Sequence, residues 1–306
     1  MRTIFLFALA FALGAQAQAE PDLSVHVSDF DIGKFHRESH RRHPYGKGNV
    51  WTNFVLPPDA DGTSPVLVTN DDGSRSLFAS NLEDVFENLI RLSAETGRKV
   101  GTLDLVAHGF PGAISFAADR RAFASGDCEA ARKLIAGPDE ASYRKYYAGT
   151  SLAAHERMLK SSTFANGRIA CGSTAVDFKK TASRLTVVQA VFSERARIRI
   201  LGCNVGRGSV GTLFVSEVAK ALLIPGTDAS VTAIRHYGLI DWSIPEGEGF
   251  WDVIGESQAS RDEQTYPKDE MDSRYMKRGS IAVARFRAGK WRVAVTSDLS
   301  ILRLDD

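Results

Sequence analysis

Residues 103–109 read Leu-Asp-Leu-Val-Ala-His-Gly and residues 199–204 read Arg-Ile-Leu-Gly-Cys-Asn, so two apolar runs each end in one reactive side chain. Short apolar runs closed by glycine are typical of buried strands in a sheet that is covered on both faces. In an open parallel sheet, ligands gather beyond the carboxyl ends of the strands. We therefore expect His108 and Cys203 at one edge of such a sheet.

The chain around these two stretches alternates between β-rich and amphipathic runs. This alternation predicts an α/β fold with a mostly parallel sheet flanked by helices. Residues 110–180 break the rhythm and are interpreted as an insertion with helices near 129–136 and 140–160, and residues 281–296 predict a C-terminal β-hairpin. The expected strands cover 50–56, 65–69, 102–107, 198–201 and 230–234, and the expected helices cover 82–96, 185–192 and 213–223.

The first 19 residues have the features of a signal peptide. Arg2 precedes an unbroken apolar run over 4–12, and Ala17-Gln18-Ala19 forms a small-residue cleavage site. The apolar run is shorter than the ~20 residues that a spanning helix needs. We expect a periplasmic or secreted protein that starts near Glu20 and has no stable membrane insertion.

Three segments are expected after the signal peptide. Residues 20–49 are predicted to be a polar arm, residues 50–245 a catalytic domain and residues 246–306 a β-rich extension. The arm carries His36, His40 and His43 among arginines, which suggests either a metal site or a basic linker. We favour the linker, because no second ligand cluster stands at metal-ligand spacing, and we expect no metal or other cofactor.

Charge balance bears on the class of partner. The 38 Lys and Arg residues nearly match the 37 Asp and Glu residues, so no overall field draws the protein to nucleic acid or to an anionic membrane. We therefore expect neither nucleic acid nor a membrane as a partner, and the sequence leaves the oligomeric state open.

The three cysteines acquire a meaning from export. Oxidising compartments favour paired thiols, and an odd count leaves one over. Cys128 and Cys171 lie in the same irregular region, so a Cys128–Cys171 disulfide with a free Cys203 is the simplest assignment. Two other pairings stay open.

His108 and Cys203 together can perform nucleophilic catalysis. An adjacent imidazole favours the thiolate form of a cysteine, which is the reactive nucleophile. Gly109 leaves its backbone exposed to a substrate, so the N–H groups of Gly109 and Cys203 can form an oxyanion hole. The sequence therefore predicts a cysteine hydrolase with a His108/Cys203 dyad.

The strand ending in His-Gly followed by a strand ending in Cys resembles the caspase, gingipain and legumain group of cysteine peptidases. Residues 106–113 and 200–206 look most like an uncharacterised caspase-like domain of large bacterial surface proteins, over roughly residues 65–240. The resemblance implies a caspase–haemoglobinase fold, an endopeptidase that acts on a protein or peptide substrate, and a pocket for a charged P1 side chain. Arg235 would favour an acidic P1 residue and Asp241 a basic one.

The sequence also departs from the caspase pattern. Cys203 follows Leu-Gly where caspases have Gln-Ala, and the interval from His108 is 95 residues (203 minus 108), against roughly 50 in caspases. A non-catalytic caspase-like binding or scaffold module of the envelope is the main alternative function. An esterase is a weaker one, because no Gly-x-Ser-x-Gly elbow accompanies the dyad.

Overall fold

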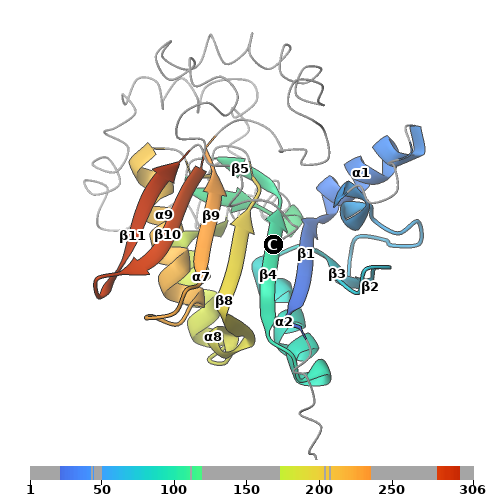
Figure 1. Cartoon of the computed structure of the whole chain (residues 1–306). Helices are drawn as coiled ribbons and strands as arrows, with labels where there is room; N and C mark the ends of the chain where they lie inside the picture. The colour runs from blue at the N-terminus through green and yellow to red at the C-terminus, as the bar shows by residue number, and fades with distance from the viewer. Residues whose placement is uncertain are drawn as a thin grey trace, which may run out of the picture.

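One eight-stranded sheet organises the part of the chain that the structure describes. The computed structural model describes residues 21–42, 44, 50–110, 112–118, 173–202, 205–206, 208–235 and 281–296. These residues form an α/β fold whose large sheet is flanked by helices (Figure 1). In sheet order the strands are β11 (Lys290–Thr296), β10 (Ile281–Arg287), β9 (Ser230–Ile234), β8 (Phe192–Ile200), β4 (Val100–Val106), β1 (Leu23–Asp29), β3 (Arg75–Ala79) and β2 (Val66–Thr69).

The sheet is mixed, so the prediction of a mostly parallel sheet was wrong. Its inner strands β9, β8, β4, β1 and β3 are parallel, whereas β2 and the β10–β11 hairpin add antiparallel strands at the two edges. The reason is local for β2–β3 and for β10–β11, because tight turns join these antiparallel neighbours. Strands β9 and β10 also pair antiparallel, although residues 235–280 separate them in the chain. Gly73, with φ +82°, closes the turn between β2 and β3 and donates to the Asn70 carbonyl at 3.0 Å.

One face of the sheet is apolar and covered by α2 (Leu82–Thr96), α7 (Ala175–Arg184), α8 (Val188–Val191) and α9 (Gly208–Leu222) (Figure 1). The core includes Phe178, whose ring meets Phe86 of α2 at 6.0 Å and Phe214 of α9 at 5.6 Å, both edge-on. Asn81 caps α2 by accepting from the Asp84 N–H, and Gly97 ends the helix in a left-handed conformation.

The opposite face is covered over β1 and β3 by α1 (Phe30–Arg42) and the 3₁₀ helix η1 (Val50–Phe54). A small apolar cluster here joins Phe30, Leu56, Phe78 and Ala117. Gly33 lets α1 approach closely, since a Cβ on it would stand 2.9 Å from Cδ1 of Phe78. His36 of the histidine-rich stretch is buried on this helix.

Two predictions for the N-terminal half were wrong. Residues 23–42, expected to be part of a polar arm, form an inner strand and a helix, and the strand expected at 50–56 begins as η1. Polar residues such as His26 and Ser28 break the apolar run of β1, although both are buried. Strand β3 was not anticipated.

Later elements match the sequence more closely. The predictions of α2, of β9 and of the hairpin are confirmed. The helix expected at 185–192 is instead α8, since Phe192 already opens β8. The same sheet extends across the expected segment boundaries at 49/50 and 245/246.

A small second sheet forms at the two ends of the expected insertion and consists of β5 (His108–Phe110), β6 (Ala113–Ser115) and β7 (Ser173–Thr174). The helices expected at 129–136 and 140–160, and the signal peptide at 1–19, lie outside the described residues. Within the described ranges, no helix is both long and apolar enough to span a membrane.

Candidate functional site at the carboxyl edge of the sheet

The neighbouring parallel strands β4 and β8 set the geometry of the candidate site. Their register pairs Thr102 with Arg197 and continues to Leu105 with Ile200, so paired positions differ by 95 in number (197 minus 102). The same difference, 95, separates positions 108 and 203. Cys203 itself lies outside the described residues.

The backbone flanking Cys203 contacts the chain that carries His108. The Leu201 N–H donates to the Leu105 carbonyl at 2.8 Å, and the Gly112 N–H donates to the Val205 carbonyl at 3.0 Å. A Cβ added to Gly202 would stand 3.0 Å from the Ala107 carbonyl oxygen and 3.1 Å from Cα of Gly109. Described residues on both sides of Cys203 therefore lie against residues 105–112.

His108 begins β5 at the point where β4 ends, and its side chain is exposed. It pairs with Ser115 of β6, and Gly109 pairs with Ile114. The end of β6 is tied to the main sheet, because the carboxylate of the buried Asp29 accepts from the Ala117 N–H at 2.7 Å. The sheet therefore holds both the strand before His108 and the strand opposite it.

The remaining predicted site residues divide between described and undescribed parts of the chain. Arg235 directly follows β9 and is half-buried, and β9 pairs with β8. Asp241, Cys128 and Cys171 lie outside the described residues, so the P1 pocket and the disulfide stay predictions. Among the residues with described placement, no group of three His, Cys, Asp or Glu side chains could hold a metal ion.

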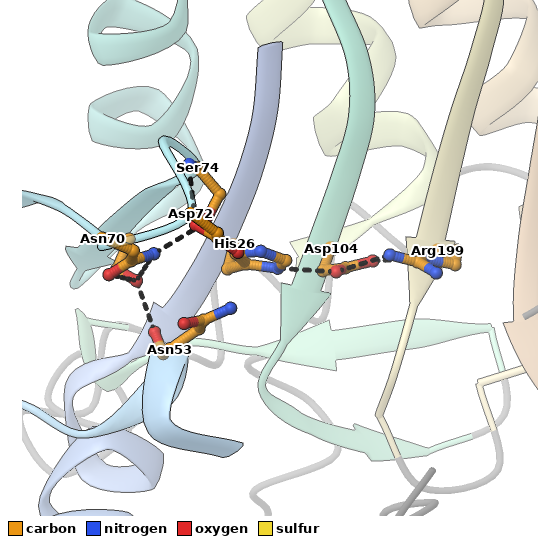
Figure 2. Close-up of polar contacts among 8 residues, drawn as sticks. His26, Asn53, Asn70, Asp72, Ser74, Asp104 and Arg199 are labelled. Atoms are coloured by element: carbon orange, nitrogen blue, oxygen red, sulfur yellow. Dashed lines mark hydrogen bonds and ion pairs between the residues drawn. The ribbon is translucent and has the colours of Figure 1, made fainter. Parts of the chain in front are cut away.

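A buried polar network crosses the same strands and was missed from the sequence. Figure 2 shows His26 of β1, Asp104 of β4 and Arg199 of β8 in one row. Asp104 Oδ1 accepts from Arg199 Nε at 2.5 Å, and its Oδ2 contacts Arg199 Nη2 at 2.7 Å and His26 Nδ1 at 2.8 Å. The three residues are only 3%, 1% and 3% exposed, respectively.

The charges of this network determine the ionisation of Asp104. Burial by itself would raise the pKa of this carboxyl group. The guanidinium of Arg199 and the hydrogen bond from His26 outweigh burial and hold the pKa below its ordinary value. Asp104 is therefore a carboxylate in the folded protein at neutral pH.

The polar row continues on both sides of the network. Ser76 of β3 stands opposite His26, and Thr232 of β9 stands opposite Arg199, both buried. The Ser76 hydroxyl donates to the Asn53 carbonyl at 2.6 Å and also contacts the Asn70 side chain. Along this row the interior of the face is polar, in contrast with the apolar face under α2 and α9.

One signal in the sequence could have located the network. Asp104 and Arg199 are charged residues inside apolar strand runs, and each stands four positions before a predicted dyad residue. Charged residues are rarely buried unless they are paired. Two opposite charges in predicted inner strands therefore suggest a buried ion pair between them. His26 gave no such signal, because β1 itself was not anticipated.

The fold and this edge define the chain as an α/β protein with a large mixed sheet and polar groups at the carboxyl ends of its parallel strands. A comparison with family models, curated proteins and solved structures found no match to the chain. Any activity must therefore be argued from the residues themselves.

Proposed function

We propose that this chain is an exported cysteine endopeptidase with a caspase-like fold, in which Cys203 is the nucleophile and His108 the base. The observation that carries the proposal is the register of β4 and β8. The two strands are paired with the offset of 95 that also separates His108 from Cys203. We infer that positions 108 and 203 come close together where the two strands have ended, which is an extension of this register beyond the described pairs.

The close approach at Gly202 supports the same arrangement. Its Cα lies so near Ala107 and Gly109 that an added Cβ would press on their backbone. This close approach brings the residue before the cysteine against both neighbours of the histidine.

The proposed reaction follows from these positions. His108 takes the proton of the Cys203 thiol, and the thiolate attacks the scissile carbonyl carbon to form a tetrahedral oxyanion. The N–H groups of Gly109 and Cys203 donate to that oxyanion, and each such donor contributes about 3 kcal/mol to transition-state stabilisation. His108 then protonates the leaving amine, and a water molecule activated by His108 hydrolyses the thioester.

Substrate selection is proposed to involve the chain after β9. Arg235 follows a strand that pairs directly with β8, which places it beside the strand leading to Cys203. Pairing a P1 side chain with an opposite charge discriminates strongly against uncharged residues. Arg235 favours an acidic P1 residue, and Asp241 would favour a basic one.

The test compares single and double variants of the dyad. On a peptide library that the native protein cleaves, the variants His108→Ala and Cys203→Ala should each show no cleavage. The double variant should be little worse than either single variant. Residues that act as one catalytic unit give such non-additive losses, whereas two independent positions would multiply their effects. Thermal unfolding of each variant checks that the fold is kept.

Iodoacetamide labelling followed by mass spectrometry separates the enzyme from the scaffold alternative. In the enzyme, Cys203 should be the readily alkylated thiol, with Cys128 and Cys171 oxidised to each other. Near-native cleavage by Cys203→Ala would disprove the nucleophile assignment. A native chain that cleaves no library peptide and whose Cys203 reacts like an ordinary thiol would favour a scaffold.

A further inference from the structure

The buried ion pair stands at a special position relative to the proposed dyad. Asp104 of β4 precedes His108 by four residues in the chain, and Arg199 of β8 precedes Cys203 by four residues. Asp104 and Arg199 are direct partners in the register of the two strands. The pair therefore lies inside the sheet, four residues before the positions of the proposed dyad on each chain segment.

Stability does not explain why these charges are buried. Taking two ions out of water costs several kcal/mol each, and apolar side chains of similar volume often serve stability as well or better. The opposite face of the same strands is in fact apolar, with Leu103 and Ile198 paired and buried beside the ionic pair. A buried ion pair is better suited to select one arrangement among several.

The geometry of the pair selects one register of β4 against β8. Arg199 binds both carboxylate oxygens of Asp104, through Nε at 2.5 Å and Nη2 at 2.7 Å. A slip of one residue would turn Asp104 toward the apolar face, and a slip of two would separate the partners by about 7 Å. Either slip leaves buried charges without a partner, which is energetically costly. Two purely aliphatic strands could slip without this cost.

We propose that Asp104 and Arg199 are positioning residues, which hold β4 and β8 in the register that the proposed dyad of His108 and Cys203 requires. His26 assists by hydrogen bonding to the same carboxylate and so linking β1 to β4. This inference rests on the proposed dyad. It gives a positioning role to Asp104, Arg199 and His26, which take no part in the proposed reaction steps.

The test uses the pH profile of Cys203 alkylation by iodoacetamide, with the labelled peptide identified by mass spectrometry. A thiol paired with an imidazole reacts at lower pH than a free thiol, whose pKa is about 8.5. The main variant combines Asp104→Asn with Arg199→Met, which removes both charges but leaves His26 an oxygen to contact. A second variant, Arg199→Lys, keeps the charge and loses the two-point contact.

The matched control is Ile198→Ala, which removes a buried side chain of β8 on the opposite face. It should lower the melting temperature but keep the native alkylation profile. In the double variant we expect the rate at pH 6 to fall by about tenfold or more and the profile to move toward that of a free thiol. Arg199→Lys should shift the profile in the same direction by a smaller amount. If the double variant does not fold, this shift tests the positioning role.

Failure of this inference differs from failure of the proposed function. If the native profile is acid-shifted and His108→Ala abolishes the shift, the dyad stands. Folded Asp104 and Arg199 variants that keep the shift would then overturn the positioning role alone. If the native thiol already titrates as a free one, the proposed dyad fails, and the positioning role fails with it.

Discussion

At the scale of single residues, Gly202 shows how closely the two strand ends approach. It is buried, and an added Cβ would stand 2.9 Å from Cγ2 of Val205 as well as against the backbone of Ala107 and Gly109. The contact with Val205 is shorter than real Cβ atoms show, and the contacts with Ala107 and Gly109 are tighter than most, so these neighbours would have to shift. The shift would fall on the residues that flank His108 and Cys203.

We predict that Gly202→Ala lowers kcat/KM of the proposed peptidase by at least about tenfold while costing about 1–3 kcal/mol of stability through overpacking. Peptide cleavage and urea unfolding measure the two effects. The control is Gly226→Ala, which has open space around its Cβ but a φ of +88°. Its strain costs about 1–2 kcal/mol and should leave cleavage unchanged. Equal activity losses in both variants would contradict the prediction.

Residue-level reasoning found His108 and Cys203 because a reactive side chain beside glycine at the end of an apolar run is a local pattern. The same reasoning missed the contacts among His26, Asp104 and Arg199. Their partners stand 78 and 95 positions apart in the chain, and only the pairing of strands brings them together.

At the scale of elements, the Asp104 network joins three neighbouring strands and makes their association sensitive to acid. Arg199 and His26 outweigh the effect of burial and hold the pKa of Asp104 below its ordinary value of about 3.9. Between the folded and unfolded pKa values, the unfolded chain binds more protons than the folded one. Stability therefore rises with pH in this window and falls as the pH drops through it.

We predict that the contribution of Asp104 to the free energy of unfolding is constant above about pH 5 and declines below about pH 4. Asp104→Asn should be less stable at neutral pH by about 3–5 kcal/mol, because it leaves Arg199 buried without its carboxylate. Its acid decline should also be shallower than that of the native chain. Urea unfolding from pH 3 to pH 7 measures both, and Ile198→Ala, which loses stability without touching the carboxylate, should keep the native slope. A native slope in Asp104→Asn would refute the assignment.

Elements with one clear pattern were predicted well, and those with mixed patterns were not. Helix α2 carries apolar residues at helical spacing between an Asn cap and a closing glycine, so residues within or next to the helix determine where it begins and ends. Strand β1 alternates between apolar and polar residues, a pattern that by itself is typical of a strand with one exposed face, whereas its polar residues His26, Ser28 and Asp29 are buried. Its place inside the sheet depends on partners from β3 and β4.

At the scale of the whole molecule, the C-terminal hairpin belongs to the main sheet and is not an appendage. Strand β10 pairs with β9 from Ile281 against Ile234 to Arg285 against Ser230. Ile281, Ala282 and Ala284 are fully buried. Strand β9 pairs in turn with β8, which leads to the candidate site.

We predict that deletion of residues 281–306 prevents cooperative folding, because it removes buried apolar surface and leaves β9 as an unpaired edge. Circular dichroism melts and size-exclusion chromatography test this expectation. The control, Val295→Thr on β11, changes a side chain that is 47% exposed and should alter stability by less than about 0.5 kcal/mol. A deleted chain that melts cooperatively as a monomer would show that the hairpin is dispensable.

The sequence by itself determined the α/β class, the best-defined helix, the hairpin and the two strand ends that carry His108 and Cys203. These features depend on interactions between residues a few positions apart, such as periodic apolar faces, caps and turns. Only the tertiary structure decided the strand order, the antiparallel edges, the inner position of β1 and the offset of 95 between β4 and β8. Those features arise from pairing between distant segments, where burial, strand register and the ion pair of Asp104 with Arg199 act together.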